Sequence, residues 1–187
     1  MIDPTDITNY ARTKDELEEL ILNAAAFAGK NARQQAQKMH RLLFIDAPDG
    51  SPFEKIRLWG SINAVATVLE RDRIGKYSLL SQLFHELAHS SVDLSACSVE
   101  DLVRFRGIGP KTARFFVLHS RPQQELIVLD THILKEMRSL GFTVPKFTPA
   151  AKKYLELEQQ YIGHLKQRGI TDFAAHDLNT WKKYSVR

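Results

Sequence analysis

The stretch LVRFRGIGPKTARFFVL, residues 102–118, contains two apolar, helix-like segments separated by a turn with two closely spaced glycines. Gly107 and Gly109 permit positive φ and let another backbone approach, and Pro110 suits the first position of a second helix. The side chain of Ile108 can point inward between the glycines and hold the two helices together. Such a turn presents backbone amides beside a helix N-terminus, which is an arrangement suited to binding a phosphate.

The spacing hydrophobic-x-x-x-x-Gly-Ile-Gly-x-x-x-Ala is that of a helix-hairpin-helix motif, which we place at residues 99–120. A hairpin of this kind grips the DNA backbone without reading base sequence. The alternative is a plain connection between two helices, which the glycine pair, Pro110 and Ala113 make the minority interpretation. The residues that we expect to contact DNA are Gly107, Ile108, Gly109 and Thr112.

The rest of the chain also has helical patterns, so the predicted fold class is all-α. We expect residues 1–187 to form a single domain of two helical lobes. One long helix is predicted over 53–73, following Pro52, and the strand-like run at 126–129 is too short to make a sheet. The side chains that we expect to cap helix N-termini are Thr13, Asn31, Ser78, Ser98, Asp130, Thr148 and Thr171.

The composition is that of a globular protein, with 43% hydrophobic and 26% charged residues. The net charge of +4 and the pI of about 9.2 allow a nucleic-acid partner. Cys97 is the single cysteine, which excludes a disulfide framework and a four-cysteine iron–sulfur cluster. Because no secretory signal and no apolar run near the ~20 residues of a membrane span is apparent, we expect an intracellular protein without a membrane partner.

Two residues near the hairpin suggest chemistry on a sugar. Lys111 lies in the first turn of the second helix, where the positive end of the helix dipole favours the neutral, nucleophilic amine. Nineteen residues later, Asp130 follows the apolar run LIVL at the start of another helix, where we expect its carboxylate to stay ionised. A neutral amine can attack C1′ of a deoxyribose that carries a damaged base, while the carboxylate stabilises the oxocarbenium-like sugar. The resulting Schiff base permits β-elimination, which nicks the strand.

Each of these two residues also has a simpler interpretation. Lys111 can merely contact a phosphate, and Asp130 can merely cap its helix. Their occurrence together, behind the hairpin, favours catalysis by both.

A second motif, LFHELAHS at residues 83–90, has the His-Glu-x-x-His spacing of a zinc metalloprotease helix. A catalytic zinc needs a third protein ligand, and the extended motif would place glycine and histidine where this chain has Val92 and Ser95. Glu100 is the nearest substitute, on the next short helix. We therefore favour an amphipathic scaffold helix carrying His85 and His89, and keep a zinc hydrolase as the less favoured alternative.

RGIGPKTA followed by VLDTHILKEM resembles the helix-hairpin-helix, Gly/Pro-Asp (HhH-GPD) superfamily of base-excision DNA glycosylases. The resemblance implies a two-lobed helical architecture, with Lys111 as the Schiff-base lysine and Asp130 as the catalytic aspartate. Members that only remove bases usually lack a lysine at this position, so the chain resembles a bifunctional glycosylase/AP lyase.

The stretches AAAFAGKNARQQ, residues 24–35, and HDLNTWKKYSVR, residues 176–187, resemble the compact archaeal-type 8-oxoguanine DNA glycosylases. That resemblance implies that Asp177 and Trp181 lie near the base pocket, although simple core packing remains an equal alternative for Trp181. The family's Ser-x-Gln-x motif, whose glutamine fills the gap left in DNA, has no clear counterpart here.

The function predicted from these features is removal of an oxidised base, with 8-oxoguanine preferred, from double-stranded DNA by a monomeric enzyme. A non-enzymatic DNA-binding module built on the same hairpin is the alternative. No organic cofactor or catalytic metal is required, and the resemblance implies that the hairpin carbonyls of Val103, Phe105 and Ile108 can hold a monovalent cation.

Overall fold

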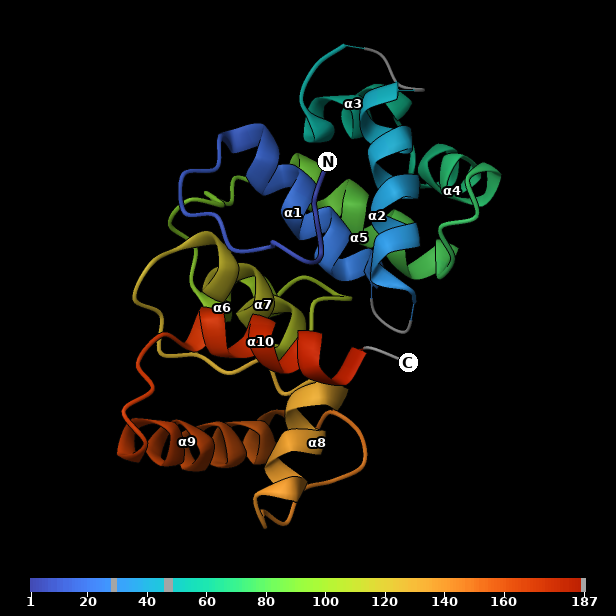
Figure 1. Cartoon of the computed structure of the whole chain (residues 1–187). Coiled ribbons are helices and arrows are strands. Elements are labelled where there is room, and N and C mark those ends of the chain that lie inside the picture. Colours follow the sequence, from blue (N-terminus) through green and yellow to red (C-terminus); the bar gives the residue numbers. More distant parts are fainter. Residues whose placement is uncertain (28–29, 46–48, 186–187) are drawn as a thin grey trace. The chain divides into compact units, whose positions relative to one another are not determined.

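A computed structural model describes residues 1–27, 30–45 and 49–185 (Figure 1). Over these residues the chain is helical and contains no β-strand, as the fold class predicted. The run at 126–129 is extended but does not pair with another segment as a strand. None of the helices in this described part has the length and apolar character that crossing a membrane requires.

The chain divides into two compact units, and the division falls at the end of the hairpin turn, between Gly109 and Pro110. The first unit contains residues 1–4 and 11–109, and the second contains residues 5–10 and 110–187. The helices of the first unit are α1 (Lys14–Phe27), α2 (Ala32–His40), the π-helical turn η1 (Arg41–Ile45), α3 (Pro52–Trp59), α4 (Ile62–Arg71), α5 (Tyr77–His89) and α6 (Val99–Val103).

Helix α5 packs against α3 and α4 in the first unit, and α1 packs against α2. The prediction of one long helix over 53–73 is wrong, because α3 ends at Trp59 and a separate helix, α4, begins at Ile62. Gly60 has a φ of +84° between them, which is incompatible with continuing a helix. Ser61 then caps α4 by accepting the N–H of Ala64 at 3.3 Å.

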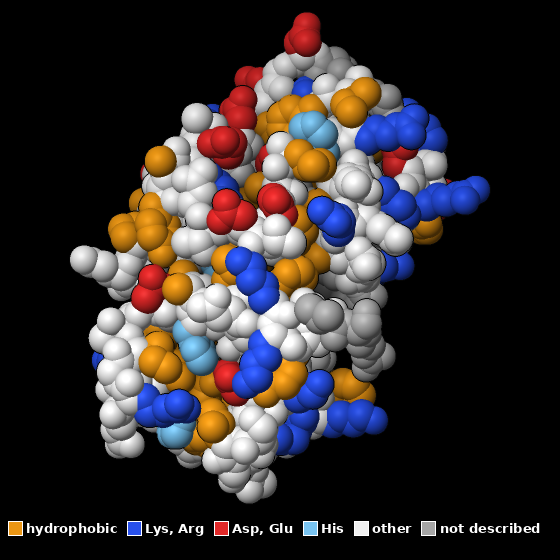
Figure 2. All heavy atoms as spheres, in the orientation of Figure 1, with side chains coloured by type: hydrophobic (Ala, Val, Ile, Leu, Met, Phe, Trp, Pro, Cys, Tyr) orange, Lys and Arg blue, Asp and Glu red, His pale blue; other side chains and the backbone are white. Residues whose placement is uncertain are grey.

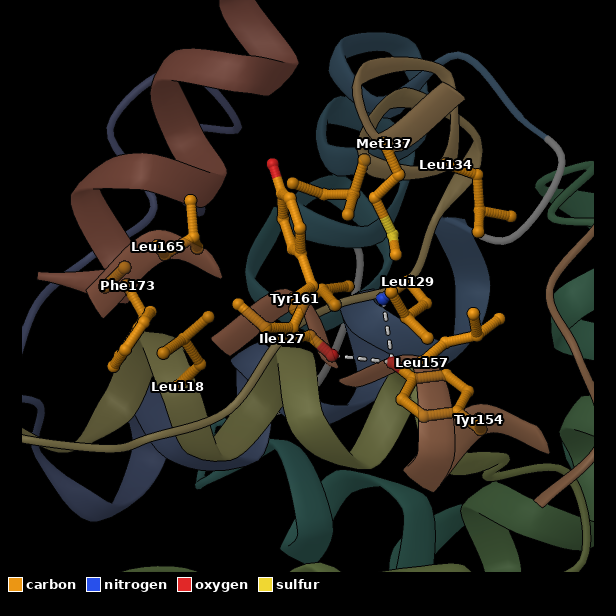
Figure 3. Close-up of a cluster of buried hydrophobic side chains, with 13 residues drawn as sticks. Leu118, Ile127, Leu129, Leu134, Met137, Tyr154, Leu157, Tyr161, Leu165 and Phe173 are labelled. Atoms are coloured by element: carbon orange, nitrogen blue, oxygen red, sulfur yellow. Dashed lines mark hydrogen bonds between the residues drawn. The ribbon is translucent and has the colours of Figure 1, made fainter. Parts of the chain in front are cut away.

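The second unit contains α7 (Pro110–Ser120), α8 (Thr131–Ser139), α9 (Ala151–Gln167) and α10 (Phe173–Ser185). Its core is a cluster of buried side chains from these helices and from the extended segment at 127–129 (Figure 3). Tyr154 and Tyr161 of α9 are the largest members of this cluster, and neither has exposed surface. The segment that leads into Asp130 is thereby embedded in the core of the unit.

The N-caps predicted at Thr13, Asn31, Ser98 and Asp130 are confirmed by their hydrogen bonds. Three others are wrong. Ser78 lies inside α5, which follows Lys76 in the left-handed conformation. Thr148 donates its hydroxyl to the carbonyl of Leu129 instead of capping α9. Asp172, and not Thr171, accepts the Ala175 N–H in the first turn of α10.

Candidate active site

The hairpin turn has the geometry that its glycines predicted. Gly107 has a φ of +112°, and a Cβ built there would meet the side chains of Leu83 and Leu79 at 3.3 and 3.4 Å. A larger residue at position 107 would therefore be strained and crowded. Ile108 is buried, with 3% of its surface exposed, and its N–H donates to the carbonyl of Phe105 at 3.0 Å.

The other residues of the predicted DNA contact lie on either side of this turn. Gly109 is exposed, and a Cβ placed there would meet nothing within 4 Å. Pro110 begins α7, and both Lys111 and Thr112 are half-buried in the first turn of that helix. The space beside Gly109 is therefore open, as binding of a phosphate at this turn would require.

Asp130 caps α8 with its side chain. Its Oδ1 accepts the N–H of His132 at 2.8 Å and the N–H of Ile133 at 2.9 Å. The cap fixes the carboxylate at the start of α8, and both of these hydrogen bonds are accepted by Oδ1. The expected cap and the expected catalytic group are therefore the same side chain, so the two interpretations of Asp130 are compatible.

Opposing influences act on the ionisation of Asp130. Burial is the largest influence and raises its pKa, the hydrogen bond from Ile133 lowers it, and the negative charge of Asp177 raises it further. The positive charges of Lys111 and His132 lower it, but the pKa stays above its ordinary value of 3.8. The expectation that a helix cap keeps this carboxylate ionised took account of only one of these influences. The charges of Lys111 and Asp177 thus both act on Asp130, in opposite directions.

A buried network holds the segment that precedes Asp130. Nε of Arg114, which is buried on α7, lies 2.7 and 2.8 Å from the two carboxylate oxygens of Glu158 on α9. Glu158 Oε1 also accepts the backbone N–H of Ile127 at 2.9 Å. The hydroxyl of Tyr154 donates to the carbonyl of Ile127 and accepts the N–H of Leu129, both at 2.8 Å (Figure 3). The helix that carries Lys111 and the segment that carries Asp130 are thus joined through α9.

Sequence reasoning did not identify Arg114, Tyr154 or Glu158. Arg114 lies three residues after Lys111, and Tyr154 and Glu158 are one helical turn apart on one face of α9. Glu158 is 4% exposed, and a carboxylate so deeply buried needs a partner. The sequence held one sign of this network, which is the position of Glu158 among the apolar residues of α9.

Asp177 and Trp181, the two residues predicted for the base pocket, lie one turn apart on α10. The side chain of Asp177 is 14% exposed, and its Oδ2 lies 3.1 Å from Nε2 of His119. Trp181 is half-buried. The charge of Asp177 raises the pKa of Asp130, so α10 influences the carboxylate at the start of α8.

The His-Glu-x-x-His helix does not present a zinc site among the residues that the structure describes. The rings of His85 and His89 stack with their centroids 4.2 Å apart, and Nδ1 of His89 lies 2.8 Å from the carbonyl oxygen of His85. Within residues 1–27, 30–45 and 49–185, no group of three or more His, Cys, Asp or Glu side chains could hold a metal ion. Leu83, Phe84 and Leu87 of the same helix are fully buried, as a scaffold helix predicts.

The carbonyl groups proposed for a monovalent cation are those of Val103, Phe105 and Ile108. All three are neutral oxygen donors, which suit a hard cation. The Phe105 carbonyl accepts the N–H of Ile108 and keeps one lone pair for a second interaction. The donor set therefore fits such an ion, and its binding here stays a prediction.

Comparison with known proteins supports the fold. No family model matches the chain, and no curated protein matches it at the sequence level. A solved structure of the Methanocaldococcus jannaschii 8-oxoguanine glycosylase/lyase, in complex with a 15mer DNA containing 8-oxoguanine, matches with a TM-score of 0.67. The match covers 94% of this chain and 83% of that chain at 17% sequence identity. The chain therefore shares the all-helical fold of that glycosylase/lyase structure.

Proposed function

We propose that this protein is a base-excision DNA glycosylase with AP lyase activity that removes an oxidised purine, 8-oxoguanine in the first instance. The observation that carries the proposal is the fold match to a solved glycosylase/lyase, in a chain that has Lys111 in the first turn of α7 and Asp130 at the cap of α8. The charge of Lys111 also lowers the pKa of Asp130. The sequence resemblance points to the same pair of residues, and the neighbouring structure holds DNA with this lesion.

In the proposed reaction, the damaged nucleotide leaves the duplex at a cost of a few kcal/mol, which damage reduces. Nζ of Lys111 forms a bond to C1′, the glycosidic bond breaks, and the base leaves with a proton. The ionised form of Asp130 stabilises positive charge on the sugar during this step. The nitrogen lone pair then expels O4′, which opens the sugar ring and takes up a proton from water, and the product is the protonated Schiff base on Lys111. Removal of a C2′ proton then breaks the bond from C3′ to the phosphate oxygen.

The partner in this proposal is double-stranded DNA, bound by one protein molecule. The hairpin amides hold a phosphate near the lesion, with a monovalent cation on the carbonyls nearby and no catalytic metal. Lys and Arg side chains also gather over α8 and the adjoining part of α10 in the second unit (Figure 2). Lys135 and Lys183 both contact the ring of Tyr184, at 4.7 and 4.9 Å from its centroid. This positive surface suits the DNA backbone.

Borohydride trapping tests the proposal directly. The protein is incubated with duplexes that carry 8-oxoguanine, thymine glycol, uracil or an abasic site, and is then reduced and run on a denaturing gel. We expect a covalent adduct on the 8-oxoguanine duplex that is absent in Lys111→Gln. The matched control is Lys166→Gln, because Lys166 is exposed and pairs with Glu125 at the surface, so its adduct should equal that of the wild type.

The other outcomes separate the alternatives. An adduct on the abasic duplex alone would mean that the lyase step occurs without removal of this base, and would refute the substrate assignment. Binding to all duplexes with no adduct on any of them would favour the non-enzymatic DNA-binding module. An adduct that persists in Lys111→Gln would assign the nucleophile to another amine.

A further inference from the structure

A buried histidine connects the N-terminal segment of the second unit to Asp177. His119, near the end of α7, has no exposed surface. Its Nδ1 lies 2.8 Å from the hydroxyl of Thr8, and its Nε2 lies 3.1 Å from Oδ2 of Asp177. An ionised carboxylate only accepts, so Nε2–H donates to Asp177, while the Thr8 hydroxyl satisfies the other ring nitrogen. Both nitrogens of a fully buried ring therefore have partners.

The surroundings of His119 restrict the orientation of its ring. The ring of Phe115, one turn earlier on α7, packs edge-on against it with the centroids 4.9 Å apart. The backbone N–H of Asn9 donates to the carbonyl of His119 at 3.1 Å, which holds the segment containing Thr8 beside the helix. The imidazole is consequently positioned from both sides, and its N–H is directed at one carboxylate.

The location of His119 relates it to the proposed chemistry. Lys111, Phe115 and His119 recur at intervals of four residues, so they lie along one side of α7. Asp177 acts electrostatically on Asp130, as Lys111 does. One helix therefore carries the proposed nucleophile at its start and, two turns on, the residue that anchors a second carboxylate of the same site.

We infer that His119 is a positioning residue, which with Thr8 holds the carboxylate of Asp177 in place beside the Lys111–Asp130 pair for the reaction. The inference rests on the proposed function. Both the sugar in the transition state and the protonated Schiff base on Lys111 carry positive charge. A second carboxylate fixed in the site stabilises that charge without having to reorganise during the reaction. An unanchored Asp177 would sample other rotamers and lose part of this effect.

A purely structural role makes a different prediction. Leucine could fill much of the volume of the ring, so a role in packing alone would leave the reaction rate unaffected in a folded His119→Leu protein. Asp177 also keeps some exposure, which a carboxylate that serves only the core would not need. The distinction can therefore be measured as a change in rate without a change in DNA affinity.

The experiment compares single-turnover base release and DNA affinity in four proteins: wild type, His119→Leu, His119→Gln and Thr8→Val. We expect His119→Leu to be slower by roughly 10- to 100-fold, because misplacement of a group in the site costs rates of this order. Its affinity for the damaged duplex should match that of the wild type. His119→Gln keeps an N–H donor near the position of Nε2 and should recover most of the rate. Thr8→Val should show a smaller loss in the same direction.

His164→Leu is the matched control. His164 is a half-buried histidine of α9 in the same unit, stacked on Tyr161, and its Nε2 is buried without a partner among the described residues. Its replacement should leave the rate unchanged. Thermal unfolding of each variant shows whether it is folded, and if His119→Leu does not fold, Thr8→Val decides, because it leaves the buried ring in place.

The outcomes distinguish this inference from the proposed function. If the wild type releases no base and forms no trapped adduct on any lesion, the proposed function fails. If the wild type is active and His119→Leu is equally fast, the positioning role is refuted. Equal losses in His119→Leu and His119→Gln would also refute it, because the donated hydrogen bond would then be irrelevant.

Discussion

The starts of α6 and α8 are built from the same element, an aspartate whose carboxylate accepts backbone N–H groups, yet the two aspartates ionise differently. Asp101 accepts the backbone N–H and the hydroxyl of Ser98, and these hydrogen bonds, with the charge of Arg104, lower its pKa. Burial raises the pKa of Asp130 despite two cap hydrogen bonds, and the charge of Asp177 adds to the effect. The local motif alone therefore does not determine the charge of a capping aspartate.

Asp101 and Asp130 also differ in the contacts that hold their surroundings in place. Asp101 is on the surface, and its cap is formed by neighbours in sequence. Asp130 follows a segment bound to Tyr154 and Glu158, which come from a helix more than twenty residues further along the chain. The first arrangement suits a helix that only has to begin, whereas the second fixes a carboxylate in a defined position.

The largest expected effect comes from exchanging each aspartate for asparagine. Asparagine is also a good N-cap, so Asp130→Asn should keep α8 while removing the charge. We expect single-turnover base release to fall by roughly 10²- to 10⁴-fold, the usual range for a group that manages charge or protons in the transition state. Asp101→Asn is the control and should have the wild-type rate. Similar rates in the two variants would contradict a catalytic role for Asp130.

The next largest effect is expected from breaking the buried network of Arg114 and Glu158 that holds the segment before Asp130. Glu158→Gln leaves the guanidinium of Arg114 buried without its charged partner, which should lower the free energy of unfolding by about 3–5 kcal/mol. Glu156→Gln on the same helix breaks an exposed ion pair with Lys153, whose expected contribution is at most about 1 kcal/mol. Urea denaturation of both variants measures the difference. Equal losses would show that burial does not distinguish the two pairs.

The features that the sequence predicted and those that it did not differ in the same way: the first depend on neighbouring residues and the second on long-range contacts. The hairpin turn, the burial of Ile108 and the caps at Ser98 and Asp130 depend on residues within a few positions of one another, and these were predicted. The ion pair of Arg114 with Glu158 joins residues 44 positions apart, and the contact of His119 with Asp177 joins residues 58 apart. Such contacts depend on how helices pack, which no local pattern encodes.

The errors in the predicted helix boundaries, by contrast, are explained by residues at the boundaries themselves. Gly60 lies inside the helix predicted over 53–73, but its positive φ ends α3, and Ser61 caps the next helix. The cap predicted at Thr171 lies one residue too early, because the neighbouring Asp172 is at least as good a cap as threonine. Neither error affected the site, because Lys111 and Asp130 lie at helix starts that were correctly placed.

A smaller effect concerns the pH dependence of stability. The native pKa of Asp130 is raised, so the folded protein keeps this proton to a higher pH than the unfolded chain does. Its contribution to the free energy of unfolding is therefore lost as pH rises from its ordinary value of 3.8 through the native pKa. For Asp101 the native pKa is lowered, so its contribution is present at neutral pH and is lost as pH falls below 3.8.

Asparagine variants should therefore show opposite trends when unfolding is followed from acid to neutral pH. Relative to wild type, Asp130→Asn should gain in unfolding free energy as pH rises, and Asp101→Asn should lose. When Asp177→Asn is already present, the gain in unfolding free energy caused by Asp130→Asn should be smaller, because one of the charges that raise the pKa of Asp130 is gone. Parallel trends at positions 101 and 130 would contradict the opposite pKa directions.

The smallest expected effect is at Ser98. Ser98→Ala removes the hydroxyl that accepts the N–H of Asp101 at 3.1 Å, and loss of a capping side chain costs about 1 kcal/mol. Because α6 has only five residues, the loss should appear mainly as local opening, which hydrogen exchange of the amides at 99–103 would detect. Since α6 leads into the hairpin, we expect weaker DNA binding but an unchanged rate of base release on saturating DNA. Ser98→Asn restores a cap and should reverse both changes, whereas a slower rate on saturating DNA would mean that α6 also positions the residues of the chemical step.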